Sequence, residues 1–187
     1  MPRNSSSSRD KLPKYLAETE VKRVLEKAAA EKRRDHLILL TLFRTGLRVS
    51  ELTDLKKRDI RQKENEIVVR EGKGNKDRIV PLESELGHLL GYYADDKGKH
   101  EKIFDISTRT VRNIVKRHTK DLDLSLPAEK ISPHTFRHSF AVKVLKDGMD
   151  IRSLQKIMGH SNIETTMIYL DVVAEDVKQA FEVTRWD

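Results

Sequence analysis

The sequence contains no cysteine and no long hydrophobic run in its 187 residues. Without cysteine, the chain can form neither disulfides nor thiolate metal sites. Its most apolar stretch, residues 36–43, is much shorter than the roughly 18 to 20 residues that a membrane-spanning helix needs. Residues 1–14 also lack the apolar segment of a secretory signal peptide. We therefore expect a cytoplasmic protein with no membrane partner.

Positive charge is in excess and is unevenly distributed. The chain has 37 Lys and Arg against 30 Asp and Glu, a formal net charge of +7. Residues 107–120 carry five basic side chains and no acidic one, whereas residues 171–187 carry five acidic and two basic ones. A basic surface indicates a polyanionic partner. The distribution places that partner at residues 107–120 and not at the tail.

The length favours a single domain, because domains average about 150 residues. Residues 2–9 are polar and of low complexity. We interpret residues 1–11 as the disordered remnant of a linker and residues 12–187 as one folded domain.

Hydrophobic periodicity and turn residues predict a mainly α fold with a small three-stranded antiparallel β-sheet, which is an α+β class. The β-branched runs lie at residue 60, at 66–70 and at 78–80, and the glycine-rich residues 72–75 predict a hairpin turn. Helices are expected over residues 18–32, 36–43, 83–94, 107–120, 133–147, 150–159, 162–171 and 174–183.

The helix that follows Pro133 carries two histidines and an arginine. His134 and Arg137 are three residues apart and share a face. His134 and His138 are four apart and, with His160, would suit part of a metal site. A guanidinium beside a cation is unfavourable, however, and the intervening residues include no glutamate base. We therefore expect no metal and no cofactor.

Three further polar residues have chemistry suited to catalysis, but each alone also fits a structural role. Arg48 can pair with Glu51. Lys73 lies between two glycines, where a solvated turn lysine is common. Tyr169 alone also fits a structural tyrosine that packs its ring in the core and leaves its hydroxyl at the surface.

Taken together, these residues lie in four segments with a familiar order and spacing: TGLRVSEL (45–52), GKGNKDRIVPL (72–82), SPHTFRHSFA (132–141) and MGHSNIETTMIYLDV (158–172). The segments resemble the catalytic domain of tyrosine recombinases, the Xer and phage-integrase family. The resemblance runs from about Leu12 to the C-terminus. The chain departs from the family pattern at two positions. Met158 replaces the more usual leucine before Gly-His, and Ala17 stands where a Ser or Thr helix cap is common. The family's catalytic set maps onto Arg48, Lys73, His134, Arg137, His160 and Tyr169.

The resemblance implies a site-specific DNA recombinase or integrase that cleaves and rejoins strands without metal or ATP. Tyr169 would attack a DNA phosphodiester and form a 3′-phosphotyrosine with a free 5′-hydroxyl. Two guanidiniums, those of Arg48 and Arg137, would stabilise the charge on the phosphate oxygens.

The remaining members of the set would handle protons. His134 is the expected proton partner of Tyr169, whose phenol is almost fully protonated at neutral pH. Lys73 would protonate the leaving 5′ oxygen, and His160 would donate to a phosphate oxygen.

The implied partner is double-stranded DNA with inverted-repeat target sites. The family's N-terminal core-binding domain is expected to be absent from this chain. The helix at 174–183 is expected to join subunits of a homo-tetramer on DNA, with a monomer when free. Contacts to DNA are expected from Lys76 and Arg78 on the hairpin and from Arg109, Arg112 and Lys116 on one helix face.

Two alternatives stay open from the residues alone. A type IB topoisomerase uses a similar site to relax a single duplex. A non-catalytic DNA-binding regulator would need only the basic surface, but it would have no use for the complete set of six catalytic residues.

Overall fold

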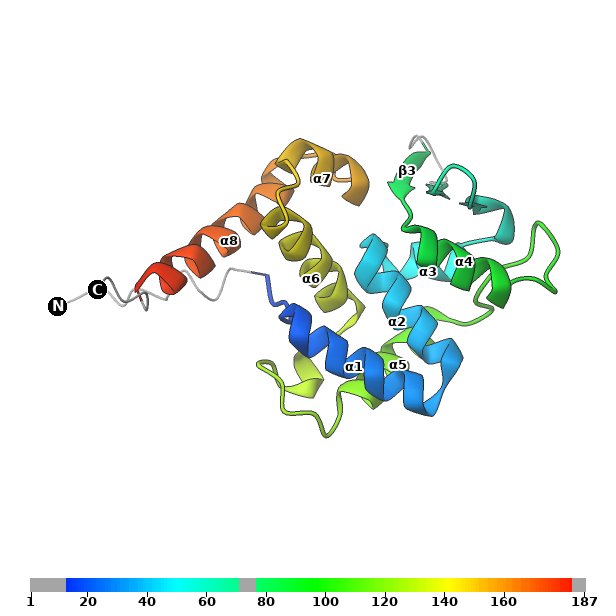
Figure 1. Ribbon diagram of the computed structural model, residues 1–187, viewed down its shortest axis with the longest axis horizontal. Helices are drawn as coiled ribbons and strands as arrows, with labels where there is room; N and C mark the ends of the chain where they lie inside the picture. Colours follow the sequence, from blue (N-terminus) through cyan, green and yellow to red (C-terminus); the bar gives the residue numbers. More distant parts are fainter. Residues whose placement is uncertain (1–12, 71–76, 183–187) are drawn as a thin grey trace.

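The computed structural model describes residues 13–70 and 77–182 and confirms the mainly helical fold with a small sheet (Figure 1). The helices are α1 (Glu18–Glu31), α2 (Arg33–Thr45), α3 (Val49–Asp54), α4 (Ser84–Tyr93), α5 (Thr108–Thr119), α6 (Pro133–Lys146), α7 (Ile151–Met158) and α8 (Glu164–Glu182). The strands are β1 (Ile60–Arg61), β2 (Glu66–Val69) and β3 (Arg78–Pro81).

Helix α2 lies at the centre of the core and contacts α1, α3, α4, α5 and α6. Its sequence is apolar on nearly every side, and Ile38, Leu39 and Leu42 are fully buried. A helix surrounded by others has no need of a polar face. The expected buried helix over residues 36–43 is therefore confirmed.

Helix α6 is the second central element, and it packs on α2, α7 and α8. Pro133 occupies its first turn, where the missing N–H costs nothing. The Ser132 backbone N–H donates to the Thr135 hydroxyl and closes the start of the helix. The buried Phe136 and Phe140 then fix its inner face against α2.

The sheet is antiparallel in the order β1-β2-β3, with Ile67 opposite Val80 and Val68 opposite Ile79. Strand β3 packs against α7 and thus joins the sheet to the helix that ends at residue 158. The predicted hairpin turn, with Lys73 and Lys76, falls at residues 71–76, outside the described residues.

One expectation about helices was wrong, and one helix was not predicted. Residues 164–182 form one continuous helix, α8, in place of the two predicted at 162–171 and 174–183. No glycine or proline interrupts residues 171–174, so the helical hydrogen bonds continue. The structure also contains the six-residue helix α3, which is too short to show a hydrophobic period.

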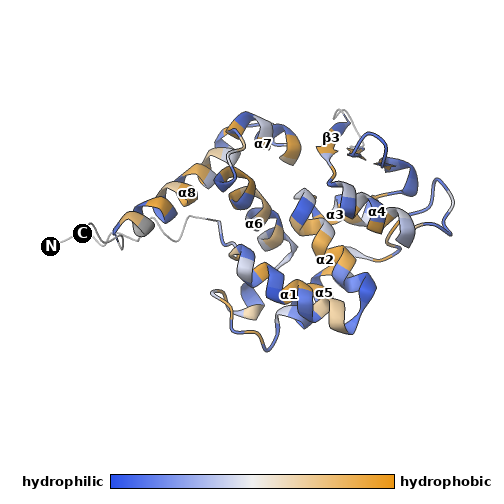
Figure 2. Cartoon of the chain, viewed as in Figure 1, coloured by the Kyte–Doolittle hydropathy of each residue, from blue (hydrophilic) through white to orange (hydrophobic). Residues whose placement is uncertain are grey.

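Hydrophobic and hydrophilic residues alternate along the helices, as expected where one face packs on the core (Figure 2). Helix α8 packs on α6 and α7 and then extends away from the body of the molecule (Figure 1). Across residues 13–70 and 77–182, no helix combines the length and the apolar composition of a membrane span.

Candidate active site

The predicted catalytic residues that the structure describes, which are all of the set except Lys73, converge where α2 and α7 end and α3 and α6 begin. Helices α2 and α7 both stop at a glycine in the left-handed conformation, with φ of 63° at Gly46 and 63° at Gly159. A Cβ on Gly46 would lie 2.3 Å from the ring of Phe140, so this turn requires glycine for space as well as conformation. The two turns bring Arg48 and His160 to the start of α6.

Arg137 is almost fully enclosed, with only 4% of the residue exposed. Its guanidinium donates to the carbonyl oxygens of Gly46 and Met158, the second at 2.6 Å, and lies 3.2 Å from His160 Nε2. Burial lowers the pKa of Arg137 to about 10, and the positive charge of Arg48 acts in the same direction. The side chain therefore stays cationic at neutral pH.

Arg48 caps the start of α3 and is held by Glu51. One guanidinium nitrogen donates to Glu51 Oε1 at 2.8 Å, and the backbone N–H of Arg48 donates to Oε2 at 2.7 Å. The second terminal nitrogen donates to the Gly159 carbonyl at 3.0 Å. The side chain of Arg48 remains 34% exposed, so it can also reach a ligand in solution.

Glu51 is a member of the site that the sequence showed only as a partner for Arg48. Its side chain is 11% exposed and also binds both terminal nitrogens of Arg78. Burial alone would raise the pKa of Glu51, but the hydrogen bonds and charges of Arg78 and Arg48 outweigh it and hold the pKa below its usual value. Glu51 is therefore an anion shared by two arginines.

Arg78, for which the sequence predicts a DNA contact, is largely enclosed by other parts of the chain. Its side chain is only 10% exposed, and Nε donates to the Ile157 carbonyl at 2.8 Å. Its side chain thus connects strand β3 to the C-terminal end of α7.

His160 follows the Gly159 turn and is neutral. Burial, with the charges of Arg137, Arg48 and Arg78, lowers the pKa of His160 to about 4. Because an arginine only donates, Nε2 accepts from Arg137, and Nδ1 carries the proton that faces the Thr166 hydroxyl at 2.9 Å. Thr166 is fully buried at the start of α8, so it fixes the orientation of the ring.

Tyr169 is 2% exposed, and its hydroxyl lies 2.8 Å from Nδ1 of His138. Burial raises the pKa of Tyr169 to about 12, although the charge of Arg137 opposes the rise. Burial also lowers the pKa of His138 to about 4, together with the neighbouring His134 and Arg137. A neutral imidazole therefore holds a protonated phenol.

The residue at the tyrosine hydroxyl is thus His138, whereas the sequence assigned this place to His134. His134 is exposed, and its ring centroid lies 6.5 Å from that of His138. Partial burial lowers the pKa of His134, and the charges of Arg137, Arg112 and Arg48 add to this effect. The only sequence signal for His138 is its spacing of four residues from His134, which also fits part of a metal site.

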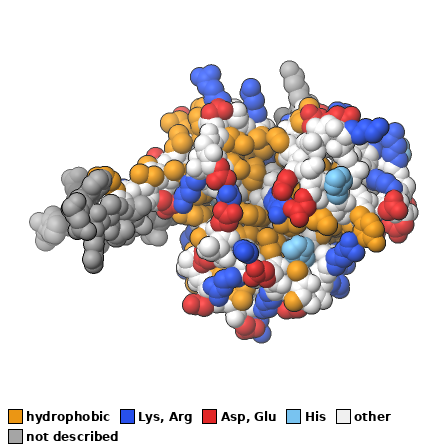
Figure 3. All heavy atoms as spheres, viewed as in Figure 1, with side chains coloured by type: hydrophobic (Ala, Val, Ile, Leu, Met, Phe, Trp, Pro, Cys, Tyr) orange, Lys and Arg blue, Asp and Glu red, His pale blue; other side chains and the backbone are white. Residues whose placement is uncertain are grey.

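Helix α5 presents a basic face that leads toward this site. Arg109, Arg112 and Lys116 are exposed, while Val111 and Ile114 are buried on the opposite side. The charge of Arg112 adds to the lowering of the pKa of His134, after burial and the charge of Arg137. On the face of the molecule seen in Figure 3, by contrast, basic and acidic side chains are intermixed. The positive charge is therefore concentrated and not spread evenly.

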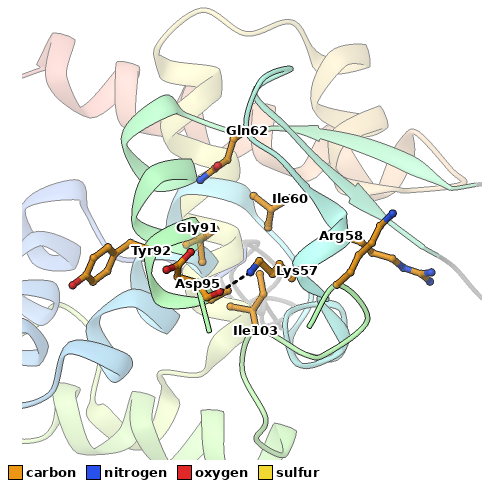
Figure 4. Close-up of a pocket in the computed structure, with 11 residues that line it drawn as sticks. Lys57, Arg58, Ile60, Gln62, Gly91, Tyr92, Asp95 and Ile103 are labelled. Carbon is orange, nitrogen blue, oxygen red and sulfur yellow. Dashed lines mark hydrogen bonds between the residues drawn. The ribbon is translucent and has the colours of Figure 1, made fainter. Parts of the chain in front are cut away.

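The described residues offer no alternative centre based on a metal. Within residues 13–70 and 77–182, no three His, Cys, Asp or Glu side chains are grouped as metal ligands. A pocket of about 630 Å³ lies between α4, β1 and the segment at 95–103 (Figure 4). Lys57 spans part of it to bind the carbonyl of Asp95, and Arg58 points away from it. No described member of the predicted catalytic set lines this pocket.

Solved structures share this arrangement of elements. A crystal structure of XerA recombinase superposes with a TM-score of 0.77 at 34% identity, over 94% of this chain and 67% of that one. The catalytic domain of bacteriophage HP1 integrase gives a TM-score of 0.66 at 26% identity, over 92% of this chain and 95% of that one. The fold is therefore that of a tyrosine recombinase catalytic domain.

Sequence comparison agrees with the fold. Tyrosine recombinase XerA of Thermococcus kodakarensis is 40% identical over 181 residues, which cover 91% of this chain and 62% of the relative. XerA of Pyrococcus furiosus is 39% identical over 181 residues and has the same coverage, 91% and 62%. The chain thus spans about 62% of the length of these curated relatives. The model of the phage integrase family matches residues 14–176, and the chain belongs to that family.

Proposed function

We propose that this chain cleaves and rejoins DNA strands at specific sites, with Tyr169 as nucleophile. The observation that carries the proposal is that one hydroxyl, two arginines and two neutral histidines meet around the end of α7. A phosphodiester is anionic and gains negative charge on its equatorial oxygens during attack. Two fixed guanidiniums, Arg48 and Arg137, are suited to stabilise that charge.

The attack requires the proton of Tyr169 to leave. With a pKa of about 12, only about one phenol in 100,000 is ionised at pH 7. Nδ1 of His138 is in place to accept the proton. A bound phosphate would oppose the charge of Arg137, which now lowers the pKa of His138, and would make the imidazole a stronger base.

The bond changes balance without a further reactant. The bond between Tyr169 Oη and phosphorus forms, and the bond between phosphorus and the 5′ oxygen breaks. Lys73 protonates the departing 5′ oxygen. His160 donates to a phosphate oxygen in its other tautomer, in which Nε2 carries the proton and Nδ1 accepts from the Thr166 hydroxyl. The covalent linkage keeps the energy of the diester, so another 5′-hydroxyl can rejoin the strand without ATP.

Double-stranded DNA with inverted repeats is the proposed substrate. The exposed basic face of α5, with Arg109, Arg112 and Lys116, supports a contact with the groove and the backbone phosphates. Lys76 would add a phosphate contact from the hairpin. XerH, which shares the fold at a TM-score of 0.77 and 24% identity, is described as bound to a palindromic difH substrate. Binding of this kind weakens steeply with salt, because counterions are released.

A homo-tetramer on DNA is proposed to assemble through the end of α8, with a monomer in the absence of DNA. Asp176 binds Tyr15 and Lys146 and fixes the middle of the helix. Beyond it, Val177 is 63% exposed and Phe181 61% exposed. A neighbouring copy offers a pocket of about 440 Å³ with an apolar floor and a charged rim. Its floor consists of Leu25, Leu40, Phe43, Phe140 and Val144.

The relatives named above are recombinases, so neither the topoisomerase nor the regulator alternative is favoured. The test is to incubate the protein with nicked suicide duplexes that carry candidate inverted repeats and to run denaturing gels. We expect an SDS-stable protein–DNA adduct that also forms in EDTA. The control Tyr169→Phe should bind the same DNA but form no adduct. An adduct from that variant, or relaxation of supercoils without site preference, would contradict the proposal.

A further inference from the structure

Three consecutive backbone carbonyls at the end of α7 each accept a hydrogen bond from a different arginine. Arg78 binds the carbonyl of Ile157 at 2.8 Å, Arg137 binds that of Met158 at 2.6 Å and Arg48 binds that of Gly159 at 3.0 Å. These carbonyls lie at a helix C-terminus, where partial negative charge attracts cations. Two of these arginines belong to the predicted catalytic set, and Arg78 does not.

Arg78 closes a ring of interactions around this helix end. Its terminal nitrogens bind the two oxygens of Glu51 at 2.9 and 2.8 Å. Glu51 binds Arg48, and Arg48 returns to the Gly159 carbonyl. Three segments far apart in sequence, the starts of α3 and β3 and the end of α7, are thus held together.

The stem of Arg78 also packs closely on the turn before His160. A Cβ placed on Gly159 would lie 3.0 Å from Cδ of Arg78, closer than most side chains approach. The position of the guanidinium therefore determines where the turn can lie. His160 follows Gly159 directly, so its ring depends on the same contact.

We propose that Arg78 is a positioning residue for strand cleavage, acting through Glu51 and the end of α7 on Arg48 and His160. The inference rests on the proposed cleavage activity. It replaces the phosphate contact expected from the sequence, because a side chain that is 10% exposed and whose guanidinium already binds Glu51 and a backbone carbonyl has little surface left for DNA. Since β3 carries Arg78, the strand that follows Lys73 in the chain is tied to the active site.

The experiment compares wild type with Arg78→Met and Arg78→Lys on the nicked suicide duplex. At saturating DNA, we expect Arg78→Met to cleave about 100-fold more slowly, the effect of a displacement of about 1 Å at a catalytic group. Arg78→Lys should also be slow, because one ammonium cannot bind two carboxylate oxygens and a carbonyl together. DNA affinity and its salt dependence should stay unchanged. Arg61→Gln, on β1 of the same sheet, is the matched control and should behave as wild type.

The outcomes separate the inference from its rivals. One contrary result is weaker DNA binding, with the slope of log affinity against log salt concentration smaller by about one, while the cleavage rate at saturating DNA is unchanged. That result would make Arg78 a phosphate contact and overturn the inference. Unchanged rates in both variants would overturn it as well. If Arg78→Met fails to fold, Arg78→Lys is combined with Glu51→Gln. If the fold reductions in cleavage rate of the two single variants multiply in the double variant, action through Glu51 is contradicted. If the double variant cleaves no more slowly than the slower single variant, it is supported. Absence of an adduct from wild type would instead contradict the proposed function.

Discussion

The two halves of the candidate active site are held in very different ways. On the arginine side, Arg48, Arg78 and Arg137 each donate to one of three consecutive backbone carbonyls, and Arg48 and Arg78 also bind the carboxylate of Glu51. On the tyrosine side, the hydroxyl of Tyr169 is held by His138 alone among the described residues. The charges proposed to stabilise the transition state are therefore already held in place, whereas Tyr169, the proposed nucleophile, is buried and protonated.

This difference has a physical reason. Charges that stabilise a transition state are most effective when they need no rearrangement during the reaction. A nucleophile, in contrast, must move to the phosphorus and back during cleavage and rejoining. Tyr169 lies on α8, whose far end leaves the body of the molecule (Figure 1). Tyr169 and this far end therefore belong to one continuous helix.

The largest effect is expected from disrupting the arginine side. Arg137→Gln would leave the buried carbonyls of Gly46 and Met158 without their cationic donor and remove charge from the phosphate site. We expect a loss of about 1 to 3 kcal/mol in the free energy of unfolding for each carbonyl left unpaired. Adduct formation should fall by about 100- to 1000-fold. Denaturant unfolding and single-turnover cleavage measure the two effects. Full stability would show that the arginine side is not preorganised as described.

A smaller effect is expected from the tyrosine side. His138→Phe keeps the ring but removes the acceptor for the Tyr169 proton. We expect cleavage to slow by about 100-fold with little change in DNA affinity, in line with the loss of general base catalysis. His134→Phe is the matched variant one turn earlier, and it should spare the tyrosine hydroxyl bond. A larger loss of cleavage rate in His134→Phe than in His138→Phe would return the proton role to His134.

The smallest effect concerns stability and pH. His138 and His160 both have their pKa lowered from 6.5 to about 4 in the folded chain. As the pH falls below 6.5, the unfolded chain takes up protons that the folded chain does not, so folding becomes less favourable until about pH 4. Urea unfolding at several pH values should show this decrease, and His138→Phe should lessen it. Stability that rises over the same interval would contradict the buried neutral state of these rings.

The sequence predicted the parts of the molecule that depend on local pattern. Hydrophobic period, the Ser132-Pro133 start and the β-branched runs were enough for α2, α6 and the sheet, and the motif spacing identified Arg48, Arg137 and Tyr169. It did not predict α3, because six residues show no periodicity. It divided α8 in two, because a stretch of small and β-branched residues resembles a helix boundary.

The hydrogen-bond partners that hold the candidate catalytic side chains in place were harder to predict. The partners of Arg78 and Arg137 are mostly backbone carbonyls, and a carbonyl has no signature in sequence. The bond from His138 to Tyr169 joins residues 31 positions apart, and the register of α6 against α8 determines it. The spacing of Glu51 three residues after Arg48 was visible, yet its second partner, Arg78, comes from a distant strand.

The most direct test of the account is to identify the residue that carries the DNA. Trypsin should release residues 157–178 as a peptide in which Tyr169 is the only tyrosine. After cleavage of a suicide duplex and digestion, mass spectrometry should find the nucleotide on this peptide, linked through a 3′-phosphate, with a free 5′-hydroxyl on the released strand. A nucleotide on any other peptide, or a link through a 5′-phosphate, would contradict the assignment of Tyr169 as nucleophile.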